Sequence, residues 1–449
     1  MDFRGKKILV CGMAKSGISA AMLVNSLGAD VTLQDIKKKE DMDDVSYIEN
    51  AGIKIYDGKN PDAIIADMDL VVVSPGIPTS LSFFEVAEKS GVRIISEVEL
   101  SYFVTPCPII AITGTNGKTT TTALTGGIIK KKYPKAAVVG NIGVPYSGKV
   151  KRLSEDDYVV AEISSFQLET AYEFHPHISA VLNITPDHLD RHKTVENYMH
   201  MKEKVFANQT SNDFVILNYD DEATRKMAEK TDAKTFFFSS SKSIDEGIYL
   251  KENDIIVKWG TFNEKVVSVN DLKVLGMHNY ENVMAAVAIS LCAGVCMKDI
   301  VSTLKEFGGV EHRIEFVKTV DGVDYYNDSK GTNTDAAIRG IMAMQKPCVL
   351  IGGGYDKGSE YDEWVEKFDG RVKHLVLIGK TAEKIENCCK MHSFNKISKC
   401  ETFEEAVNLC RTLAVNGDCV LLSPACASWD MFKSYEQRGD IFKEIVRAF

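Results

Sequence analysis

A glycine-containing loop in the middle of the chain has residues suited to binding phosphate. It reads Gly114, Thr115, Asn116, Gly117, Lys118, Thr119 and Thr120. The loop follows an apolar run at 109–113 that predicts a strand, and it opens a Thr- and Ala-rich stretch that predicts a helix. Backbone N–H groups at such a turn can wrap a phosphate, Lys118 can reach the β- and γ-phosphates of a nucleotide, and Thr119 can bind Mg²⁺. The usual loop has a further glycine where this chain has Ile112, so the match is a shortened G-x-x-G-K-[ST] variant.

A second glycine turn, at residues 12–17, resembles a dinucleotide-binding fingerprint in which Ala14 replaces the middle glycine. Asp35 follows the next expected strand, where a ribose-binding acid would stand. The middle glycine normally lets the backbone approach a pyrophosphate, and Ala14 hinders that approach. A structural turn and a nucleotide site are therefore equally compatible with this segment.

The whole chain has the size and composition of a multidomain globular protein. It has 449 residues, 45% hydrophobic and 26% charged, with a formal net charge of −10. Basic residues are interspersed with acidic ones, which argues against a nucleic-acid-binding protein. No stretch is long enough for a signal-peptide core or a membrane span, so we expect no membrane insertion. The eleven cysteines lack a metal-binding spacing and are expected to be reduced thiols of a cytoplasmic protein.

The order of expected elements divides the chain into three α/β blocks, at 1–97, 98–309 and 310–449. Expected helices lie at 18–27, 195–208 and 282–293. The expected strands are 6–11, 30–34 and 69–73 in the first block, 109–113, 136–139, 158–163, 178–184 and 214–217 in the second, and 323–327, 348–351, 374–378 and 419–422 in the third.

Seven further sequence segments form one set, because of their order and spacing along the chain. They are GNIG at 140–143, EISSFQ at 162–167, NITPDHLD at 183–190, GMHN at 276–279 with Asn282, His312-Arg313, NDSKGTN at 327–333 and SPACASWD at 423–430. Over essentially its whole length the chain thereby resembles the Mur ligases. The segments at 328–333 and 423–428 are similar to those of the members that add D-glutamate.

The resemblance implies three domains and an ATP-dependent ligase of peptidoglycan synthesis. A Rossmann-like N-terminal domain would bind the UDP moiety, a central P-loop ATPase domain with a parallel sheet would bind ATP, and a C-terminal Rossmann-like domain would bind the amino acid. D-Glutamate would be added to UDP-N-acetylmuramoyl-L-alanine through an acyl phosphate and a tetrahedral intermediate, giving ADP and phosphate. We expect these small-molecule substrates to be the partners of a monomer.

The resemblance also assigns residues to the chemistry. The catalytic residues would be Lys118, Glu162, His188 and Lys202. Two Mg²⁺ ions would be held by Thr119, Glu162, His188 and Lys202, with Lys202 carrying a carbamate derived from CO₂. A carbamate requires a neutral amine, so burial or neighbouring charge must lower the pKa of that lysine. Lys204 is the alternative position for the modified lysine.

Further binding positions follow from the same resemblance. The ATP-binding residues would be Gly114, Thr115, Asn116, Gly117, Lys118, Thr119, Thr120, Asn279, Asn282, Arg313, Asp328 and Lys330. The UDP substrate would contact Ala14, Lys15, Asp35, Lys37, Ser74, Asn141 and His188. D-Glutamate would be held by Thr332, Lys357, Ser428 and Tyr435. Trp429 stands where a smaller aliphatic residue is usual in the family, and Tyr435 stands where Phe is familiar.

Two other functions remain open from the sequence. A sister ligase with a different amino acid would share the ATP site and differ only in the third block. A non-catalytic nucleotide-binding regulator could keep the fold, although it would have little use for Lys118, Glu162, His188, Lys202 and Lys330 together.

Overall fold

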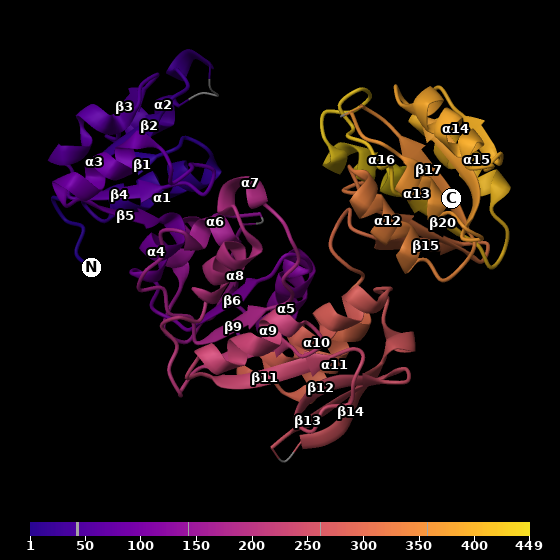
Figure 1. Cartoon of the computed structure of the whole chain (residues 1–449), viewed down its shortest axis with the longest axis horizontal. Coiled ribbons are helices and arrows are strands. Elements are labelled where there is room, and N and C mark those ends of the chain that lie inside the picture. Colours follow the sequence, from indigo (N-terminus) through magenta and orange to yellow (C-terminus); the bar gives the residue numbers. More distant parts are fainter. Residues whose placement is uncertain (42–44, 142, 261, 357) are drawn as a thin grey trace. The chain divides into compact units, whose positions relative to one another are not determined.

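Three β-sheets organise the chain, and each is mostly parallel (Figure 1). The computed structural model describes residues 1–41, 45–141, 143–260, 262–356 and 358–449. The chain divides into two compact units, which are described separately. Unit 1 comprises residues 1–268 and 281–304 and contains the first two sheets, whereas unit 2 comprises residues 269–280 and 305–449 and contains the third.

The N-terminal sheet is wholly parallel, with the strand order β3-β2-β1-β4-β5. Its elements are β1 (Lys7–Cys11), α1 (Lys15–Ser26), β2 (Asp30–Asp35), α2 (Ser46–Asn50), β3 (Lys54–Asp57), β4 (Leu70–Val73), α3 (Ser82–Ser90), β5 (Arg93–Ser96) and α4 (Glu97–Tyr102). Side chains alternate along β1, so Ile8 and Val10 join the core with α1 while Leu9 and Cys11 join the core with α3. The order reverses between β1 and β4, the place where open parallel sheets bind ligands.

The central sheet has the order β14-β13-β12-β11-β10-β9-β6-β8-β7. It is parallel from β7 to β12, and β13 and β14 extend it with antiparallel pairings. Its strands are β6 (Ile109–Thr113), β7 (Ala137–Gly140), β8 (Val159–Glu162), β9 (Ile178–Val181), β10 (Phe214–Asn218), β11 (Lys234–Ser239), β12 (Gly247–Lys251), β13 (Asp254–Trp259) and β14 (Phe262–Ser268). The helices that follow β6 in the chain are α5 (Lys118–Lys132), α6 (Ser165–Leu168), α7 (Leu189–His192), α8 (Val195–Glu203), α9 (Glu222–Met227), α10 (Met277–Cys292) and α11 (Met297–Glu306).

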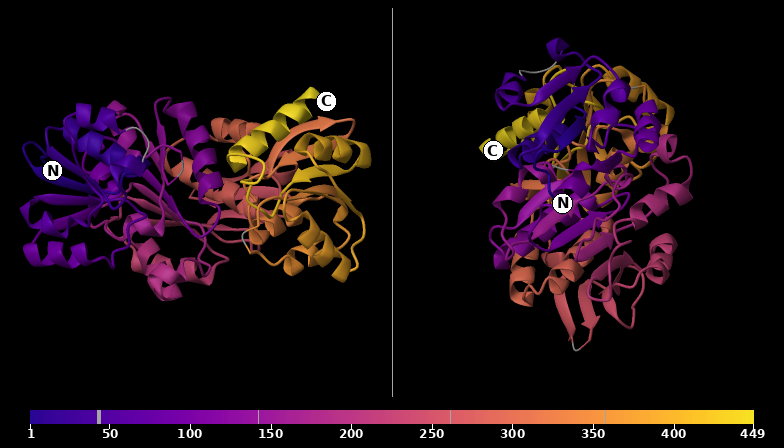
Figure 2. Two further views of the ribbon diagram at one scale, coloured as in Figure 1. Left: turned by 90° about the horizontal axis from the view of Figure 1, so that it is seen from above. Right: turned by 90° about the vertical axis from the view of Figure 1, so that its left-hand side faces the viewer.

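The third sheet has the order β15-β16-β20-β17-β18-β19 and is parallel except for the β15–β16 pair. Its elements are β15 (Glu315–Val320), β16 (Val323–Asn327), α12 (Thr334–Ala343), β17 (Cys348–Gly353), α13 (Asp362–Glu366), β18 (Val372–Ile378), α14 (Ala382–Met391), β19 (Ile397–Lys399), α15 (Phe403–Leu413), β20 (Cys419–Leu422) and α16 (Tyr435–Ala448). Cys348 and Leu350 face the core shared with α12, α13 and α14, and Val349 and Ile351 face the core shared with α15 and α16. Helix α16, drawn yellow at the C-terminal end, packs on β15 and β16 (Figure 2).

The α/β class predicted from the sequence is confirmed, but several element ends were wrong: the helix expected at 282–293 begins at Met277, the one expected at 18–27 begins at Lys15, and two further elements end early. The strand expected at 178–184 ends at Val181, because the residues that follow turn to bind the phosphate loop. The helix expected at 195–208 ends at Glu203, and Asn208 instead donates its side-chain amide to the carbonyls of Tyr172 and Phe174. The antiparallel strands β13 and β14 were not predicted.

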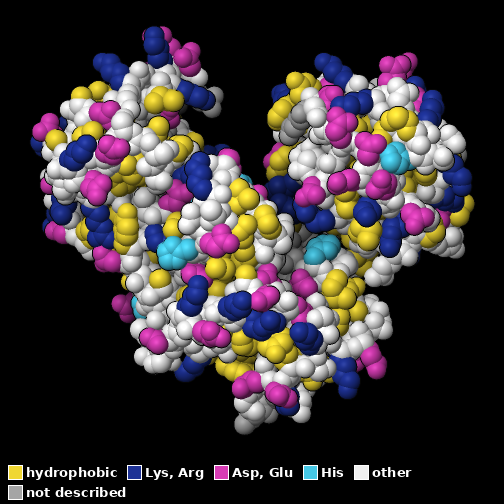
Figure 3. Space-filling model, in the orientation of Figure 1, with side chains coloured by type: hydrophobic (Ala, Val, Ile, Leu, Met, Phe, Trp, Pro, Cys, Tyr) yellow, Lys and Arg dark blue, Asp and Glu magenta, His cyan; other side chains and the backbone are white. Residues whose placement is uncertain are grey.

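Charge and hydropathy agree with the sequence-based expectations. Basic and acidic side chains are interspersed over the face of each unit shown in Figure 3. All eleven cysteines are free thiols. Among the described residues, no helix combines the length and the apolarity needed to cross a bilayer.

A buried arginine joins two of the motif segments in unit 2. The guanidinium of Arg438, on α16, donates to Ser329 Oγ (2.9 Å), to the Ser329 carbonyl (2.8 Å) and to the Cys426 carbonyl (3.2 and 3.3 Å). Arg438 is fully buried, and burial lowers the pKa of its guanidinium to about 10. It therefore fixes the loop after β16 against the loop after β20.

Replacing Arg438 with methionine should destabilise unit 2 by about 3 kcal/mol, because it leaves buried carbonyls without a charged donor. Urea unfolding followed by tryptophan fluorescence measures this, since Trp364 and Trp429 both lie in unit 2. Arg447→Met, an exposed position on the same helix, is the control and should leave the midpoint unchanged. Equal midpoints for the two variants would contradict the proposed role of Arg438.

Candidate active site

The predicted phosphate loop lies between β6 and α5, and its glycines are required by the backbone. Gly117 precedes α5 with a φ of 84°, in the left-handed region. A Cβ added there would lie 2.2 Å from Asn282 Oδ1. The sequence therefore places a residue without a side chain where the chain turns sharply and Asn282 approaches, and the amides at the start of α5 face the turn.

The segment after β9 holds this loop in place. The backbone carbonyl of Asn183 accepts a hydrogen bond from the Thr115 amide (3.0 Å). Its side-chain oxygen accepts one from the Asn116 amide (2.8 Å). Thr185 donates its amide to Thr115 Oγ1 (3.0 Å), which donates to the Thr185 carbonyl (3.1 Å). The NIT part of the segment at 183–190 is thus a support for the phosphate loop.

Two lysines converge on one carbonyl of the loop. The ammonium of Lys118 donates to the carbonyls of Gly114 and Thr115 (both 2.9 Å), and Lys202 Nζ lies 2.8 Å from the Gly114 carbonyl. Lys202 is only 1% exposed and lies over the Tyr198 ring. Burial, and secondly the charge of Lys118, lower the pKa of Lys202 to about 6. Its amine is therefore neutral at pH 7 and above.

Lys204, the alternative position for a modified lysine, is directed elsewhere. Its Nζ donates to the carbonyls of Leu168 and Glu169 (both 2.9 Å). Burial lowers the pKa of Lys204 as well, but its contacts are with the end of α6 rather than with the phosphate loop. Of the two lysines, Lys202 is the one that lies beside the phosphate loop.

Glu162 ends β8 and is almost completely buried, at 1% exposure. Its Oε1 accepts the side-chain amide of Asn141 (2.8 Å), and the Asn141 backbone amide donates to the Glu162 carbonyl (2.9 Å). Its Oε2 is buried and has no hydrogen-bond partner among the described residues. A buried carboxylate oxygen without a donor fits a cation-binding role, since an unpaired buried anion is costly.

His188 has an unusual backbone conformation. It precedes α7 with a φ of 53°, in the left-handed region that non-glycine residues seldom adopt. Its imidazole is half exposed and lies 4.8 Å from the Phe166 ring. This conformation directs the chain into the short helix α7 and leaves the imidazole available to a ligand.

Arg191, three residues further on, was not identified from the sequence. Its guanidinium binds both carboxylate oxygens of Glu169 (2.6 and 2.8 Å) and donates to the carbonyls of Pro75 and Ile77 (both 2.9 Å). It also stacks on Phe166 at 4.2 Å. Arg191 thus connects α7 to the turn after β4 of the N-terminal sheet, and its position directly after the segment at 183–190 was the only available signal.

Five of the seven residues predicted for the UDP substrate lie at the carboxyl ends of β1, β2 and β4, whereas Asn141 and His188 belong to the central sheet's loops. Asp35 accepts the amides of Met13 (2.8 Å) and Lys37 (3.0 Å), so it holds the glycine turn as well as the chain after β2. The Ser74 amide donates to the Cys11 carbonyl. Ser74 Oγ is buried, and the described residues offer it no hydrogen-bond partner. Ala14, Lys15 and Lys37 are exposed around the same edge.

Unit 2 brings its own predicted residues together around Asp328. Asp328 Oδ2 accepts the Ser423 hydroxyl (2.7 Å), which joins the segments at 327–333 and 423–430. Burial raises the pKa of Asp328 to about 7. A Cβ added at Gly331 or Gly340 would lie within 3 Å of this carboxylate, which explains the two glycines.

The other predicted residues of unit 2 flank this pair. Lys330 Nζ lies over the Tyr435 ring at 5.4 Å, and Ser329 Oγ donates to the Tyr435 carbonyl (2.8 Å). Thr332 follows Lys330 and donates its amide to the Lys330 carbonyl, and Ser428 is buried. Arg313 is exposed, Asn279 binds the Leu275 carbonyl, and Lys357 lies outside the described residues.

The comparisons with known proteins agree with this arrangement. Three domain families match the chain: the Mur ligase MurD-like N-terminal domain over residues 6–96, the Mur ligase middle domain over 112–290 and the Mur ligase glutamate ligase domain over 312–426. The UDP-N-acetylmuramoylalanine–D-glutamate ligase of Lachnospira eligens is 49% identical over 447 residues, covering 99% of each chain. The chain belongs to the Mur ligase family. The enzyme of the same name from Clostridioides difficile is 47% identical over 453 residues, again covering 99% of each chain.

Solved structures of Mur ligases share the fold. The UDP-N-acetylmuramate-alanine ligase of Thermotoga maritima has a TM-score of 0.58 at 20% identity and covers 99% of each chain. MurF from Acinetobacter baumannii has a TM-score of 0.61 at 17% identity, covering 98% of this chain and 94% of that one. As a member of this family, the chain is an ATP-dependent ligase of peptidoglycan precursor synthesis.

Replacing Arg191 with methionine should release the turn after β4, because the carbonyls of Pro75 and Ile77 lose the guanidinium that donates to them and Glu169 loses its counter-ion. Hydrogen exchange measured by mass spectrometry should be at least about 10-fold faster in peptides covering 74–77. Arg225→Met is the matched control, because Arg225 also donates to a carbonyl, that of Tyr219, and stacks on the Tyr219 ring. Unchanged exchange at 74–77 in the Arg191 variant would show that Arg191 does not hold the turn.

Proposed function

We propose that this chain is a UDP-N-acetylmuramoyl-L-alanine:D-glutamate ligase. Its curated relatives of that name are 42–49% identical over 99–100% of its length, and this is the observation that carries the proposal. The proposed domains are a UDP-substrate domain at 1–97, an ATP domain at 98–309 and an amino-acid domain at 310–449. We expect the enzyme to be a monomer and to act in the cytoplasm, where ATP and UDP-linked substrates are found.

The reaction begins with phosphorylation of a carboxylate, which is by itself a poor electrophile. The carboxylate of the UDP substrate attacks the γ-phosphorus of ATP, the bond to ADP breaks, and an acyl phosphate forms. Lys118 supports this step because its ammonium can exchange the carbonyls of Gly114 and Thr115 for phosphate oxygens. The amides at the start of α5 add further donors.

Formation of the amide follows from the acyl phosphate. The amine of D-glutamate attacks the acyl carbon, a tetrahedral intermediate forms, and phosphate leaves as the amide is completed. Negative charge accumulates in both steps, so positioned cations and N–H donors are the main requirement. Thr332, Lys357, Ser428 and Tyr435 are the proposed D-glutamate residues, and Arg313, Asp328, Lys330 and Asn279 are the proposed nucleotide residues of unit 2.

Mg²⁺ is the expected metal ion, at two sites. The donor set fits it, because Mg²⁺ prefers oxygen ligands and the buried Glu162 Oε2 has no donor among the described residues. Glu162, Thr119 and His188 are the proposed ligands together with a modified Lys202. Bound Mg²⁺ would neutralise the charge on the phosphoryl group in transfer. Asn141 holds Glu162 in the orientation that leaves its second oxygen available.

Lys202 is the proposed site of the carbamate. Its neutral amine can attack CO₂, forming an N–C bond as a proton leaves, and this exchanges a potential cation for an anion next to the phosphate loop. The pKa of about 6 means that the amine is reactive at neutral pH without a further base. As the pH falls through about 6, the amine becomes protonated and carbamate formation should be lost.

An amino-acid panel tests the proposed function. With ATP, Mg²⁺ and UDP-N-acetylmuramoyl-L-alanine, ADP release and a product peak in mass spectrometry should depend on D-glutamate. The value of kcat/KM should be at least about 100-fold lower with L-Ala, L-Lys or meso-diaminopimelate, because the first two lack a second carboxylate and the third carries its second carboxylate on a longer chain with an additional ammonium group. Reactions without an amino acid give the background. Faster turnover with one of the other amino acids would identify a sister ligase, and ATP binding without any product would identify a regulator.

Lys202→Ala should lower kcat by about 100-fold or more, because it removes the proposed carbamate from the metal-binding site. Millimolar acetate or another short-chain carboxylate should restore part of the activity. Lys204→Ala is the matched control and should neither lose activity to the same extent nor respond to carboxylate. For the unmodified enzyme in CO₂-depleted buffer, added bicarbonate should restore activity above pH 6 and have little effect below it. Wild-type rates in Lys202→Ala without rescue would refute the proposed role of Lys202.

A further inference from the structure

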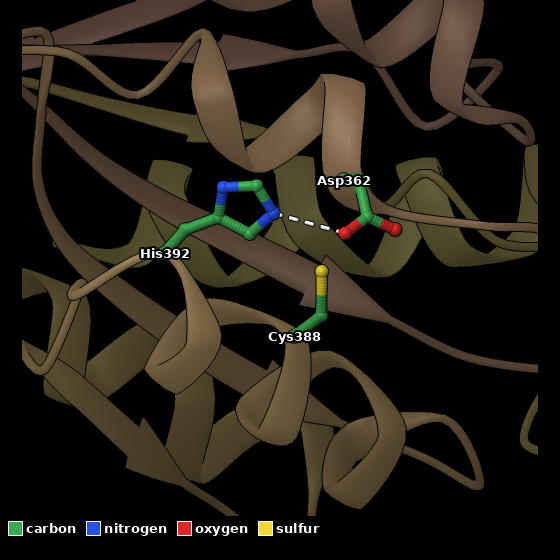
Figure 4. Close-up of side chains that lie close together, drawn as sticks. All are labelled: Asp362, Cys388 and His392. Carbon is green, nitrogen blue, oxygen red and sulfur yellow. Dashed lines mark hydrogen bonds and ion pairs between the residues drawn. The ribbon is translucent and has the colours of Figure 1, made fainter.

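A cysteine, a histidine and an aspartate converge at the edge of unit 2, away from the residues assigned above. Cys388 and His392 lie four residues apart on α14 and its C-terminal cap, so they share one helix face, and Asp362 begins α13 opposite them. One ligand atom from each of the three lies within 4.8 Å of the other two. Figure 4 shows the Cys388 thiol directed toward the Asp362–His392 pair, whose Oδ1 and Nε2 are 2.9 Å apart.

The three donors are the types that bind a transition-metal ion. Tetrahedral Zn²⁺ sites have bonds of ~2.0–2.3 Å, which places their ligand atoms about 3.3–3.6 Å apart. Small side-chain shifts reach that spacing here, since the side chains of Asp362 and His392 are 53% and 26% exposed. Thiolate and imidazole donors favour Zn²⁺ over Mg²⁺. Burial raises the pKa of the Cys388 thiol, and the neighbouring Asp362 and then the charge of Glu360 add to this.

The surrounding contacts give the cluster a defined place in the fold. Lys384 and the N-cap Thr381, one and two turns before Cys388 on the same side of α14, bind the chain between β17 and α13. The hydroxyl of Thr381 accepts the Gly354 amide (2.9 Å), and Lys384 donates to the Ser359 carbonyl (2.8 Å). Cys388 and His392 continue this row to Asp362, so an ion bound there would complete the attachment of α13 and the preceding loop to α14.

A second group of possible ligands, in the part of the chain that the structure describes, is already neutralised. Glu311, His312 and Asp440 lie within the same ligand spacing. The ammonium of Lys443, however, binds Glu311 and lies 3.2 Å from Asp440 and 3.7 Å from Glu315. A lysine thus takes the place of a metal ion there, whereas Asp362 forms an ion pair with His392 and with no lysine among the described residues.

We propose that Asp362, Cys388 and His392 form a binding site for a divalent transition-metal ion, best suited to Zn²⁺. The ion would take the place of the Asp362–His392 hydrogen bond. Cys388 would bind as the thiolate after its proton passes to the solvent, and His392 would bind as the neutral imidazole. This site is separate from the proposed Mg²⁺ sites, and its ligands are not used in the proposed reaction.

Cobalt titration of the untagged, reduced and chelator-treated full chain tests the site. Excess Mg²⁺ is included so that sites built from oxygen ligands are occupied. One equivalent of Co²⁺ should produce a thiolate-to-metal charge-transfer band, and Zn²⁺ should abolish it because Zn²⁺ binds such sites more tightly than Co²⁺. This spectroscopic readout does not depend on catalysis, so it can fail or succeed independently of the proposed function.

Three variants decide whether the band belongs to this cluster. Cys388→Ser should abolish it, and His392→Gln, at a partly exposed position at the end of α14, should weaken Co²⁺ binding by at least about 10–100-fold. Cys296→Ser is the matched control, because Cys296 is an exposed cysteine with a carboxylate, that of Asp299, at 3.2 Å but belongs to neither ligand group. It should leave the band unchanged. A wild-type chain without the band, or a band that persists in both Cys388→Ser and His392→Gln, would overturn the proposal and leave Asp362–His392 as a helix-connecting pair.

Discussion

The arrangement of unit 1 depends on the carbonyl of Gly114, which two lysine side chains share. Lys118 reaches it from the start of α5 and Lys202 from α8. Two ammonium groups around one oxygen atom would repel each other by roughly 3 kcal/mol at the effective dielectric constant of a protein. Burial already disfavours a charge on Lys202, and the repulsion adds to it, so the buried lysine is the one that loses its proton. The same loop therefore has one cation for phosphate and one neutral amine.

The sequence predicted the core strands well because their local patterns agree with their surroundings. The strands expected at 109–113, 323–327 and 419–422 were found with those bounds. The runs at 109–113 and 419–422 are mostly apolar and buried throughout, as expected for parallel strands, whereas 323–327 includes Asp324 and pairs antiparallel with β15 on one side. The strand at 178–184 was predicted too long because Ile184 is apolar, but the polar groups of Asn183 and Thr185 bind the phosphate loop. A sequence pattern contains the residues that support a loop without indicating which loop they support.

The residues of the candidate site likewise divide into those that the sequence could predict and those that it could not. The phosphate loop could be recognised from its own residues, because glycines and a lysine between strand and helix have a direct physical meaning. Lys202 could not, since a lysine on a helix is usually solvated. Its burial results from the packing of α8 on α6 and α7, which places its amine beside Thr113 and the Gly114 carbonyl. Only the resemblance to the Mur ligases pointed to it. Arg191 and Arg438 were missed for a related reason: they bind backbone carbonyls, which are present at every residue and leave no pattern in the sequence.

These interior donors follow from the backbone geometry of the loops they support. A loop that turns its N–H groups toward an anion must turn carbonyls the other way, and outside a helix or sheet those carbonyls have no regular partners. Water satisfies them only at the surface, whereas Lys202, Arg191 and Arg438 supply donors from within the protein. Arginine is suited to this because one guanidinium reaches several carbonyls: Pro75 and Ile77 for Arg191, and Ser329 and Cys426 for Arg438. Lysine reaches fewer acceptors, but it alone of the two can lose its proton near neutral pH. Position 202 therefore requires lysine, while positions 191 and 438 require the wider and permanently charged arginine.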